Sequence, residues 1–390
     1  MTRAFLTKKF FLFTFLISLF TFSFAESFTD FDFGYSLDLP EGYNIKDYTE
    51  DGKAYFLEHP NIPVSLVIKV IENEKSEKTA LKSQLDKLNA KSQLDTFKWN
   101  EKDCSFGSFS MTLDQDYAGW AAGAALKNAG TYIVLLCYAP KDKEEACQQF
   151  ILSSLNSLST SFENFISEGL VVSYAFPKEG KISVKLNIDG CQINSFLDKS
   201  DSEAAKWLVD MEYSVLTLYA NHNLWKEAWQ RYYRIIYKDE APRIANISED
   251  IYKALWQKAE IENPENPDIS YAQKLLSWVQ TFDYLRAKTA EDSDFTSLPD
   301  TILGKGNDCD SRSMLICALL KACGTESLML ISREYSHAMA AALIEAPGQT
   351  YNLPGTKLNF LMGETTAKVT WGMIAQDQAD RSKWIEVLFP

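Results

Sequence analysis

The first third of the chain alternates apolar and polar residues in the way that is typical of β-strands. Residues 35–39 alternate and stop at Pro40, and residues 64–70 predict a second strand. Three further segments, separated by turn residues, predict an antiparallel meander: 106–113, 120–126 and 131–138. Two segments have helical periodicity: 79–88 and 143–158. We therefore expect residues 26–160 to form an α/β domain, a sheet with helices packed on one face.

Residues 161–245 are expected to form a middle region with a hairpin and two helices. Segments 170–176 and 181–188 predict the hairpin, because the polar turn 177–180 lies between them. The helical stretches are 202–220 and 224–237. The second stretch carries a band of aromatic residues: Trp225, Trp229, Tyr232, Tyr233 and Tyr237. Such a band could be a ligand platform, although packing between helices is its commoner use.

Residues 246–390 are expected to form the last domain, because Pro242 interrupts the helical pattern just before it. A helical stretch at 275–285 precedes a glycine-rich polar turn, and this turn leads into an apolar helix at 314–322. Apolar residues occur on nearly every face of that helix, so we expect it to be buried. The whole chain is therefore predicted to be a multi-domain α+β protein.

The first 25 residues have the pattern of a secretory signal. Arg3, Lys8 and Lys9 precede an apolar run of about fifteen residues, and Ser23-Phe24-Ala25 is a small-x-small cleavage site. An uncleaved anchor is the rival interpretation, but the run is short for a spanning helix, which needs roughly 20 residues. We therefore expect an exported mature chain that begins at Glu26, without stable membrane insertion.

The charge of the chain excludes one class of partner. Loss of the three basic signal residues takes the net charge from −14 to −17. Such an acidic chain is poorly suited to bind a phosphate backbone, so nucleic acid is not an expected partner.

The chain has an odd number of cysteines, which leaves at least one thiol without an intrachain partner. Export permits disulfides, and one bridge is expected among Cys104, Cys137 and Cys147, with its connectivity open. No Cys or His spacing indicates zinc, and no calcium loop is visible, so we expect neither metal nor cofactor.

Cys309 lies in Gly-Lys-Gly-Asn-Asp-Cys-Asp-Ser-Arg, where the polar turn meets the apolar helix. Either Asp310 or Ser311 could cap this helix, and Gly324 could end it in the left-handed conformation. A helix N-terminus stabilises a thiolate and can bind the oxyanion of acyl transfer. The polar neighbours of Cys309 indicate access, so this cysteine is the candidate nucleophile. Cys317 and Cys323 are expected to be structural.

A cysteine nucleophile needs a base, and the chain has only three histidines: His59, His222 and His337. His337 follows Cys309 in the same domain and begins an apolar strand, 338–344. A further strand, 357–362, leads to Glu364, whose carboxylate could orient the imidazole through its second nitrogen.

This order of helix-start cysteine, strand histidine and strand carboxylate resembles the transglutaminase-like superfamily, which is related to papain-like folds. The local segments are also similar to the family: Cys309-Asp310-Ser311-Arg312-Ser313, Ser336-His337-Ala338-Met339 and Glu364-Thr365-Thr366. The resemblance is confined to the last domain, about a third of the chain, and implies a nucleophile helix packed on an antiparallel sheet.

The chain departs from the family at two points. The family more often has Asp at the third position, and this chain has no upstream Gln close before the cysteine. Tyr271, Trp278 and Gln280 are candidates for the oxyanion donor. Residues 26–160 more loosely resemble PsbP-like folds, through the segment Leu-Pro-Glu-Gly and the element order, which implies no chemistry.

Two functions remain open at this stage. The resemblance implies a cysteine enzyme that cleaves or transfers amide bonds of proteins or peptides through a thioester, in the periplasm, the cell envelope or outside the cell. The alternative is a catalytically inactive member of the same fold that serves as a binding or scaffold protein of the cell envelope. The sequence determines neither the substrate nor the oligomeric state.

Overall fold

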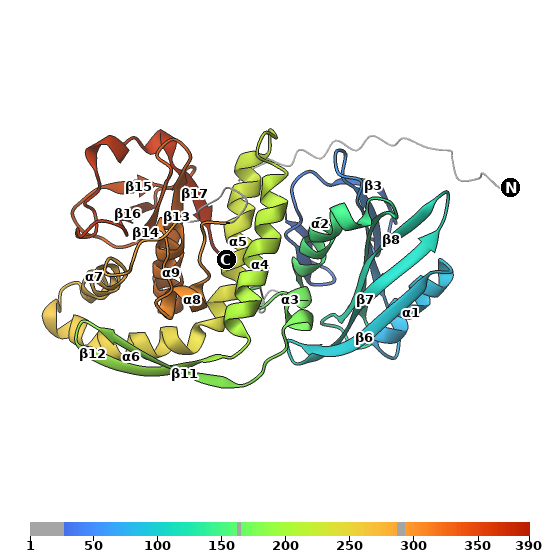
Figure 1. Ribbon diagram of the computed structural model, residues 1–390, viewed down its shortest axis with the longest axis horizontal. Helices are drawn as coiled ribbons and strands as arrows, with labels where there is room; N and C mark the ends of the chain where they lie inside the picture. Colours follow the sequence, from blue (N-terminus) through green and yellow to red (C-terminus); the bar gives the residue numbers. More distant parts are fainter. Residues whose placement is uncertain (1–26, 162–164, 287–292) are drawn as a thin grey trace.

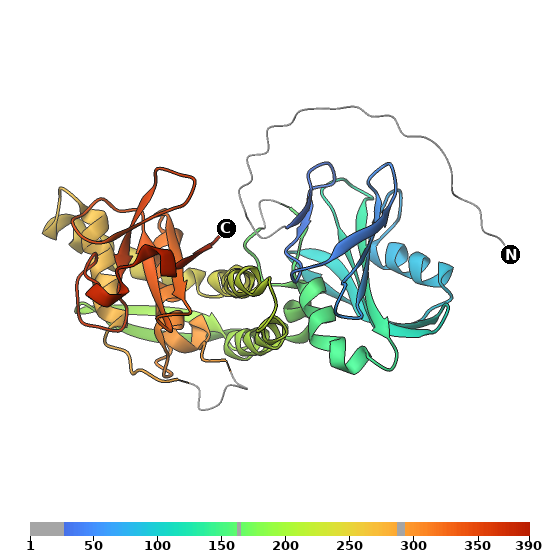
Figure 2. The same ribbon diagram turned by 90° about the horizontal axis from the view of Figure 1, so that it is seen from above.

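The computed structural model describes residues 27–161, 165–286 and 293–390 and has a mixed α+β architecture. A large sheet with its helices forms one end of the molecule and a smaller sheet forms the other, with two long helices, α4 and α5, between them (Figures 1 and 2). The expected signal, residues 1–25, lies outside the described residues. In the described ranges no helix is long and apolar enough to cross a membrane.

The N-terminal unit is built on a seven-stranded antiparallel sheet in the order β3-β4-β5-β9-β8-β7-β6. Its strands are β3 (Asn44–Tyr48), β4 (Ala54–Glu58), β5 (Ser65–Ile71), β6 (Lys91–Trp99), β7 (Lys102–Thr112), β8 (Asp116–Ala125) and β9 (Tyr132–Pro140). Strands β6 to β9 form a continuous meander. The meander expected from residues 106–138 is therefore confirmed, with one further strand at its start. A small separate sheet joins β1 (Phe28–Asp30), β2 (Tyr35–Leu37) and β10 (Leu158–Ser159).

Helices cover both faces of the large sheet, so the expectation of helices on one face was wrong. Helix α1 (Glu77–Lys87) packs with Val134 and Leu136 of β9, whereas α2 (Glu144–Asn156) packs with Ile133 and Leu135. Successive strand residues point to opposite faces. Strand β9 is apolar at consecutive positions because both of its faces are covered.

The middle region differs from its sequence prediction. Residues 170–176 were expected to be a strand, but Leu170–Ala175 is a short helix, α3. The hairpin instead joins β11 (Lys181–Ile188) to β12 (Cys191–Asp198) across Asp189 and Gly190, both of which have positive φ. Asn156 explains the helix, because its side-chain oxygen accepts hydrogen bonds from the backbone N–H groups of Val171 and Val172. A contact with a distant residue therefore overrode the local β-propensity of the valines.

The two expected helices of the middle region are present as α4 (Asp201–Thr217) and α5 (Trp225–Arg243). Helix α5 continues through Pro242 and ends one residue later. Most of its aromatic band is packing, since Tyr232, Tyr233 and Tyr237 are buried.

The C-terminal unit packs one long helix on a five-stranded antiparallel sheet in the order β15-β16-β14-β13-β17. The strands are β13 (Ser327–Ser332), β14 (His337–Ala342), β15 (Thr350–Asn352), β16 (Asn359–Gly363) and β17 (Ile385–Leu388). The helices are α6 (Ala245–Glu262), α7 (Pro267–Val279), α8 (Leu298–Ile302) and α9 (Cys309–Ala322), with short 3-10 turns at Gln376–Gln378 and Arg381–Lys383. Helix α9 is almost wholly buried against β13 and β14, as its all-round apolar pattern predicted.

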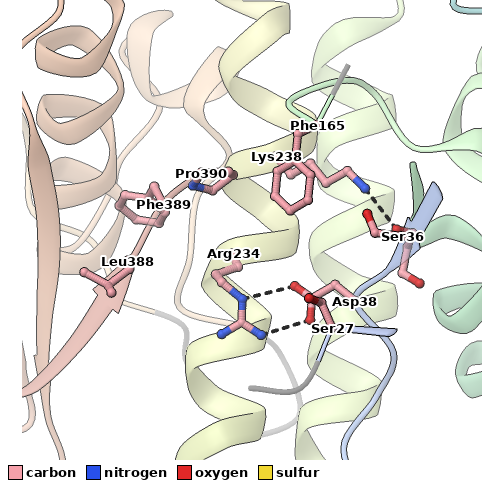
Figure 3. Close-up of a pocket in the computed structure, with 10 residues that line it drawn as sticks. Ser27, Ser36, Asp38, Phe165, Arg234, Lys238, Leu388, Phe389 and Pro390 are labelled. Carbon is pink, nitrogen blue, oxygen red and sulfur yellow. Dashed lines mark hydrogen bonds and ion pairs between the residues drawn. The ribbon is translucent and has the colours of Figure 1, made fainter. Parts of the chain in front are cut away.

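Helix α5 connects the two ends of the molecule. On one side Arg234 forms a bidentate pair with Asp38, and Lys238 donates to the backbone oxygens of Ser157 and Leu158. Both cations line a cavity of about 250 Å³ (Figure 3). On the other side Tyr237 stacks on Phe389, with ring centroids 4.2 Å apart. One rigid helix therefore sets the position of the C-terminal unit relative to the large sheet.

A buried ion pair fixes α5 to α4. The guanidinium of Arg231 donates to Glu212 at 2.7 Å and to the hydroxyl of Ser153 at 3.0 Å, and all three side chains are almost fully buried. Its Nε also donates to the backbone oxygen of Asp38 at 2.7 Å. Burial alone would disfavour the charged guanidinium, but the carboxylates around it outweigh burial and raise the pKa of Arg231.

Removal of Glu212 should therefore destabilise the protein strongly. Glu212→Ala leaves the charge of Arg231 buried and unpaired, which costs about 3–5 kcal/mol in comparable pairs. The free energy of unfolding, measured by chemical denaturation, should fall by that order. Asp210→Ala is the matched control, because Asp210 pairs with Lys206 on the exposed face of the same helix; its cost should stay below about 1 kcal/mol. Equal losses in the two variants would contradict the role of the buried pair.

Candidate active site

Cys309 is the first residue of helix α9, as the sequence predicted. The helix is capped by Asp308, whose carboxylate accepts from the backbone N–H of Ser311 at 3.2 Å and from its hydroxyl at 3.1 Å. The expectation that Asp310 or Ser311 would be the cap was wrong, because the helix begins earlier than either choice requires. Gly324 follows the helix with a φ of 88°, as expected of a left-handed cap.

The sheet brings His337 and Glu364 together. Strand β14 begins at His337 and pairs antiparallel with β16, which ends just before Glu364. The imidazole Nε2 and the carboxylate Oε2 lie 2.7 Å apart, and both side chains are largely buried. The other carboxylate oxygen accepts from the backbone N–H and the hydroxyl of Thr366, both at 2.6 Å. Burial acts to raise the pKa of Glu364, but the bonds to His337 and Thr366 outweigh it and lower the pKa.

The third predicted residue, Cys309, lies beside the start of the same strand. Helix α9 packs against β14, and the backbone N–H of Ala338, the residue after His337, acts to lower the pKa of the Cys309 thiol. His337 and Glu364 are thus in direct contact, and Cys309 begins the helix that packs on the strand of His337.

The surroundings of Cys309 differ from the expectation of an accessible thiolate. The residue is only 1% exposed, although its neighbours in the sequence are polar. Burial, then the charges of Asp310 and Asp308, raise the pKa of the Cys309 thiol well above its usual range, and the Ala338 N–H offsets only part of this effect. The thiol donates to Asp310 at 3.3 Å. The expectation of access was wrong, because the flanking carboxylates fold inward beside the sulfur.

The two carboxylates are held by the protein itself. Tyr233 of α5 donates its hydroxyl to Asp310, which also accepts from Cys309. Burial, together with the neighbouring Asp310, raises the pKa of Asp308 to about 8. Burial also raises the pKa of Asp310. Nothing in the sequence pattern identified Tyr233 as part of this site, because it lies in the middle region and reaches Asp310 only through the packing of α5.

The possible ligand atoms of Asp308, Cys309 and Asp310 lie within 4.8 Å of one another, which is close enough to consider whether they bind a divalent cation. The carboxylate oxygens already accept hydrogen bonds from Ser311, Tyr233 and Cys309. These bonds explain the cluster without an ion, and an acidic cluster alone does not define a metal site.

Arg312 ties three loops of the site to helix α9. Its side chain is 1% exposed and donates to the Asn307 amide oxygen at 2.7 Å, to the Phe282 carbonyl at 2.8 Å and to the Thr365 carbonyl at 3.3 Å. The last of these carbonyls follows Glu364 directly. Arg312 therefore couples the position of helix α9 to the position of the carboxylate beside His337.

The loop after α7 runs beside the glycine-rich turn. Tyr284 pairs with Asn307 in a parallel bridge, and the backbone N–H of Leu285 donates to the Asn307 oxygen at 2.9 Å. A Cβ on Gly306 would lie 2.7 Å from the Cβ of Leu285, so only glycine allows this approach. The approach places the loop that carries Tyr284 and Arg286 beside Asn307, two residues before Cys309. The glycine-rich turn at Gly304 and Gly306 could have indicated a close backbone contact. The sequence did not show that the partner is the loop after α7.

The three expected oxyanion donors have other roles. Gln280 donates its amide N–H to the backbone oxygens of Glu364 at 2.8 Å and Val369 at 3.0 Å, so it supports the end of β16. Tyr271 is buried among Tyr252 and Trp256. Trp278 packs edge-on against Phe282. None of them contacts Cys309 in the described structure.

An open pocket of about 780 Å³ gives access to the base and the carboxylate. Its lining includes Tyr284, Arg286, His337, Glu364 and Met373. The lining does not include Cys309, which is buried behind the residues around it.

The remaining cysteines and histidines are structural. All seven cysteines are free thiols, so the expected bridge among Cys104, Cys137 and Cys147 is not formed. These three thiols lie in the apolar core of the N-terminal unit. Cys317 is buried within α9 and Cys323 partly buried at its end, as predicted. The other histidines form hydrogen bonds away from this site: His59 with the Glu41 carbonyl and His222 with Asn61.

Comparisons with known proteins add little to this geometry. No family model matches the chain, and no curated protein matches it. Three solved structures are similar over about a third of the chain. Cyanobacterial PsbP (CyanoP) from Synechocystis is 12% identical with a TM-score of 0.30, over 37% of this chain and 98% of that protein. The Ran-binding protein Mog1p of Saccharomyces cerevisiae is 13% identical with a TM-score of 0.28, over 36% and 97%. LpqN, which is involved in cell envelope biogenesis of Mycobacterium tuberculosis, is 10% identical with a TM-score of 0.24, over 32% and 78%. Scores this low carry no argument about function.

The buried cap should make stability depend on pH. The folded-state pKa of Asp308 is raised, so the stability that its protonated form contributes is present below about pH 4 and lost as pH rises through about 8. Asp308→Asn keeps an acceptor for Ser311 and removes the titration. Between pH 5 and pH 9 the wild type should lose about 4 kcal/mol more than this variant in the free energy of unfolding, about 1.4 kcal/mol for each pH unit up to 8. Denaturation at both pH values measures the difference. Glu326→Gln, at an exposed carboxylate, is the control; a pH-independent effect of Asp308→Asn would contradict the account.

Proposed function

We propose that this chain is an exported cysteine enzyme of transglutaminase-like type that acts on amide bonds of proteins or peptides through a thioester. The observation that carries the proposal is the 2.7 Å bond between His337 and Glu364 beside a cysteine at a helix start. A carboxylate bound to Nε2 holds the imidazole so that Nδ1 can exchange a proton with a nucleophile. The proposed export depends on the signal pattern of residues 1–25.

The first half of the reaction forms the thioester. The Cys309 thiol passes its proton to Nδ1 of His337, and the sulfur attacks the amide carbonyl carbon. The carbon–sulfur bond forms while the π electrons of the carbonyl move to its oxygen. The carbonyl re-forms, the carbon–nitrogen bond breaks, and the departing amine takes the proton from His337. Glu364 stabilises the imidazolium between these two transfers.

The second half releases the acyl group. Water, or a second amine, gives a proton to His337 as its oxygen or nitrogen attacks the thioester carbon. The carbon–sulfur bond breaks and the thiolate leaves, taking up the proton that regenerates the thiol. Water yields a carboxylic acid, and an amine yields a new amide. The open pocket beside His337 has room for either acceptor.

The raised pKa of Cys309 bears on how this cycle starts. A thiol with such a pKa is neutral at rest, so the proton must move to His337 within the substrate complex. Displacement of the hydrogen bond from Cys309 to Asp310 is part of that step. The enzyme that we propose is therefore inactive until a bound substrate rearranges the residues around the sulfur.

A second candidate function is a binding or scaffold protein that has kept the fold without catalysis. The burial of Cys309 beside two carboxylates favours it, because the free thiol is then too weak a nucleophile to act. The alternative predicts that protein or peptide ligands bind equally well to a variant without the sulfur.

Cys309→Ala should abolish amide cleavage and transfer, because the sulfur forms the thioester. Turnover can be followed with a fluorescently labelled casein for hydrolysis and a dansylated amine for transfer. Cys191→Ala is the matched control, because Cys191 is a partly exposed thiol on strand β12; its activity should equal that of the wild type. An active Cys309→Ala protein would exclude the mechanism, whereas a wild type that binds these proteins without turnover would favour the scaffold function.

Glu364→Gln should lower turnover by about 10²–10⁴-fold with little change in substrate binding, because an amide cannot stabilise the imidazolium as a carboxylate does. The readout is kcat and KM for the same casein substrate. Glu345→Gln, in the loop between β14 and β15, controls for the loss of one negative charge in this unit. Similar kcat values for the two variants would contradict the role of Glu364.

A further inference from the structure

The sulfur of Cys309 is surrounded by more negative than positive groups. Titratable and charged side chains from five segments act on Cys309 directly or through Asp308 and Asp310. They are Asp308, Asp310 and Arg312 from the start of α9, Tyr232 and Tyr233 from α5, His337 from β14, Tyr284 and Arg286 from the loop after α7, and Asp294 from the segment before α8. A thiolate formed here would lie beside the carboxyl groups of Asp308 and Asp310, which disfavour negative charge on the sulfur. A cation beside the sulfur would offset this effect.

Arg286 has the position that this role needs. It lines the same pocket as His337 and Glu364, and the loop that carries it is hydrogen-bonded to Asn307, two residues before Cys309. Its Nε donates to the Tyr284 hydroxyl at 3.0 Å, and one terminal nitrogen donates to the Ser336 carbonyl at 3.0 Å. Ser336 directly precedes His337 and has a φ of 48°. Arg286 thus contacts the turn that directly precedes His337 and lies at the edge of the site.

The charge of Arg286 is not neutralised by a carboxylate of the described residues. Its hydrogen bonds go to a hydroxyl and a carbonyl, and neither carries a full charge. Burial works against the charged form, but Tyr284 and then Cys309 raise the pKa of Arg286. Arg312 is a weaker candidate, because its donors are already used by Asn307, Phe282 and Thr365.

We infer that Arg286 is a catalytic residue of the proposed reaction: its guanidinium donates a charge-assisted hydrogen bond to the Cys309 sulfur and stabilises the thiolate that attacks the amide. The thiol proton goes to Nδ1 of His337, and Arg286 stays charged throughout. The inference rests on the proposed function. Gly306 belongs to the same arrangement, since its missing side chain lets the loop that carries Arg286 lie against the turn before Cys309.

The test is the rate of Cys309 alkylation by iodoacetamide as a function of pH, followed by mass spectrometry of the peptide that contains Cys309. An opposite charge in contact shifts a pKa by about one unit or more. At any pH well below the pKa of the thiol, alkylation of Cys309 in Arg286→Gln should therefore be about tenfold slower than in the wild type, or slower still. Arg286→Lys, which keeps the charge, should recover part of the difference. Turnover of labelled casein should fall in the same order.

Arg333→Gln is the matched control. Arg333 lies in the turn between β13 and β14, but it stacks on Trp225 rather than contacting the sulfur. Its alkylation profile should equal that of the wild type. Thermal unfolding of each variant checks that the fold is intact.

An Arg286→Gln profile that coincides with the wild type would overturn the inference, even if Cys309→Ala shows that the proposed function is right. Conversely, a wild-type protein without turnover would count against the proposed function. The alkylation profiles of the wild type and Arg286→Gln would still decide whether Arg286 stabilises the thiolate. If Arg286→Gln and Arg333→Gln change the alkylation rate equally, the effect comes from the loss of surface charge in general. That result would also overturn the inference.

Discussion

The architecture depends on buried charge along helix α5. Arg231, Lys238 and Arg243 are all nearly inaccessible, and each is held by carboxylates or carbonyls from its surroundings. Ions removed from water are tolerated only when their partners are in place, so these contacts specify one arrangement of the helix against its neighbours. The same helix also carries Tyr233 to the Asp310 carboxylate. The geometry at Cys309 is in this way coupled to the packing of the N-terminal unit, which lies far away in the sequence.

Two electrostatic influences oppose each other at Cys309. The start of α9 and the Ala338 N–H favour negative charge on sulfur, whereas burial and the carboxylates of Asp308 and Asp310 disfavour it. Burial and the two carboxyl groups have the larger effect in the protein without substrate, so the thiol is neutral. The bond between His337 and Glu364 is formed in advance and needs no rearrangement. In the reaction that we propose, the base is therefore in place before substrate binds, whereas the thiol has to be activated.

The sequence prediction was correct where neighbouring residues determine the structure and wrong where contacts between distant residues determine it. Strands with strong alternation or continuous apolar runs, such as β5 and β9, were predicted correctly, because side-chain periodicity records which faces are covered. Residues 170–176 were wrongly expected to be a strand, because the side chain of Asn156 stabilises the helix from a distance. The missing bridge among Cys104, Cys137 and Cys147 has a similar cause: a count of cysteines does not reveal the core positions that each one fills.

The sequence by itself determined the order of Cys309, His337 and Glu364, and it placed them at a helix start, a strand start and a strand end. Those positions follow from local rules of capping and periodicity, which need only neighbouring residues. Only the tertiary structure decided that Cys309 is buried, that Asp308 is the cap beside it, and that Gln280 supports Glu364 instead of binding an oxyanion. It also decided that Tyr233 and Arg286 lie at the site. The reason is physical: the energy of a charge depends on every group within a few ångströms, and folding collects those groups from distant parts of the chain.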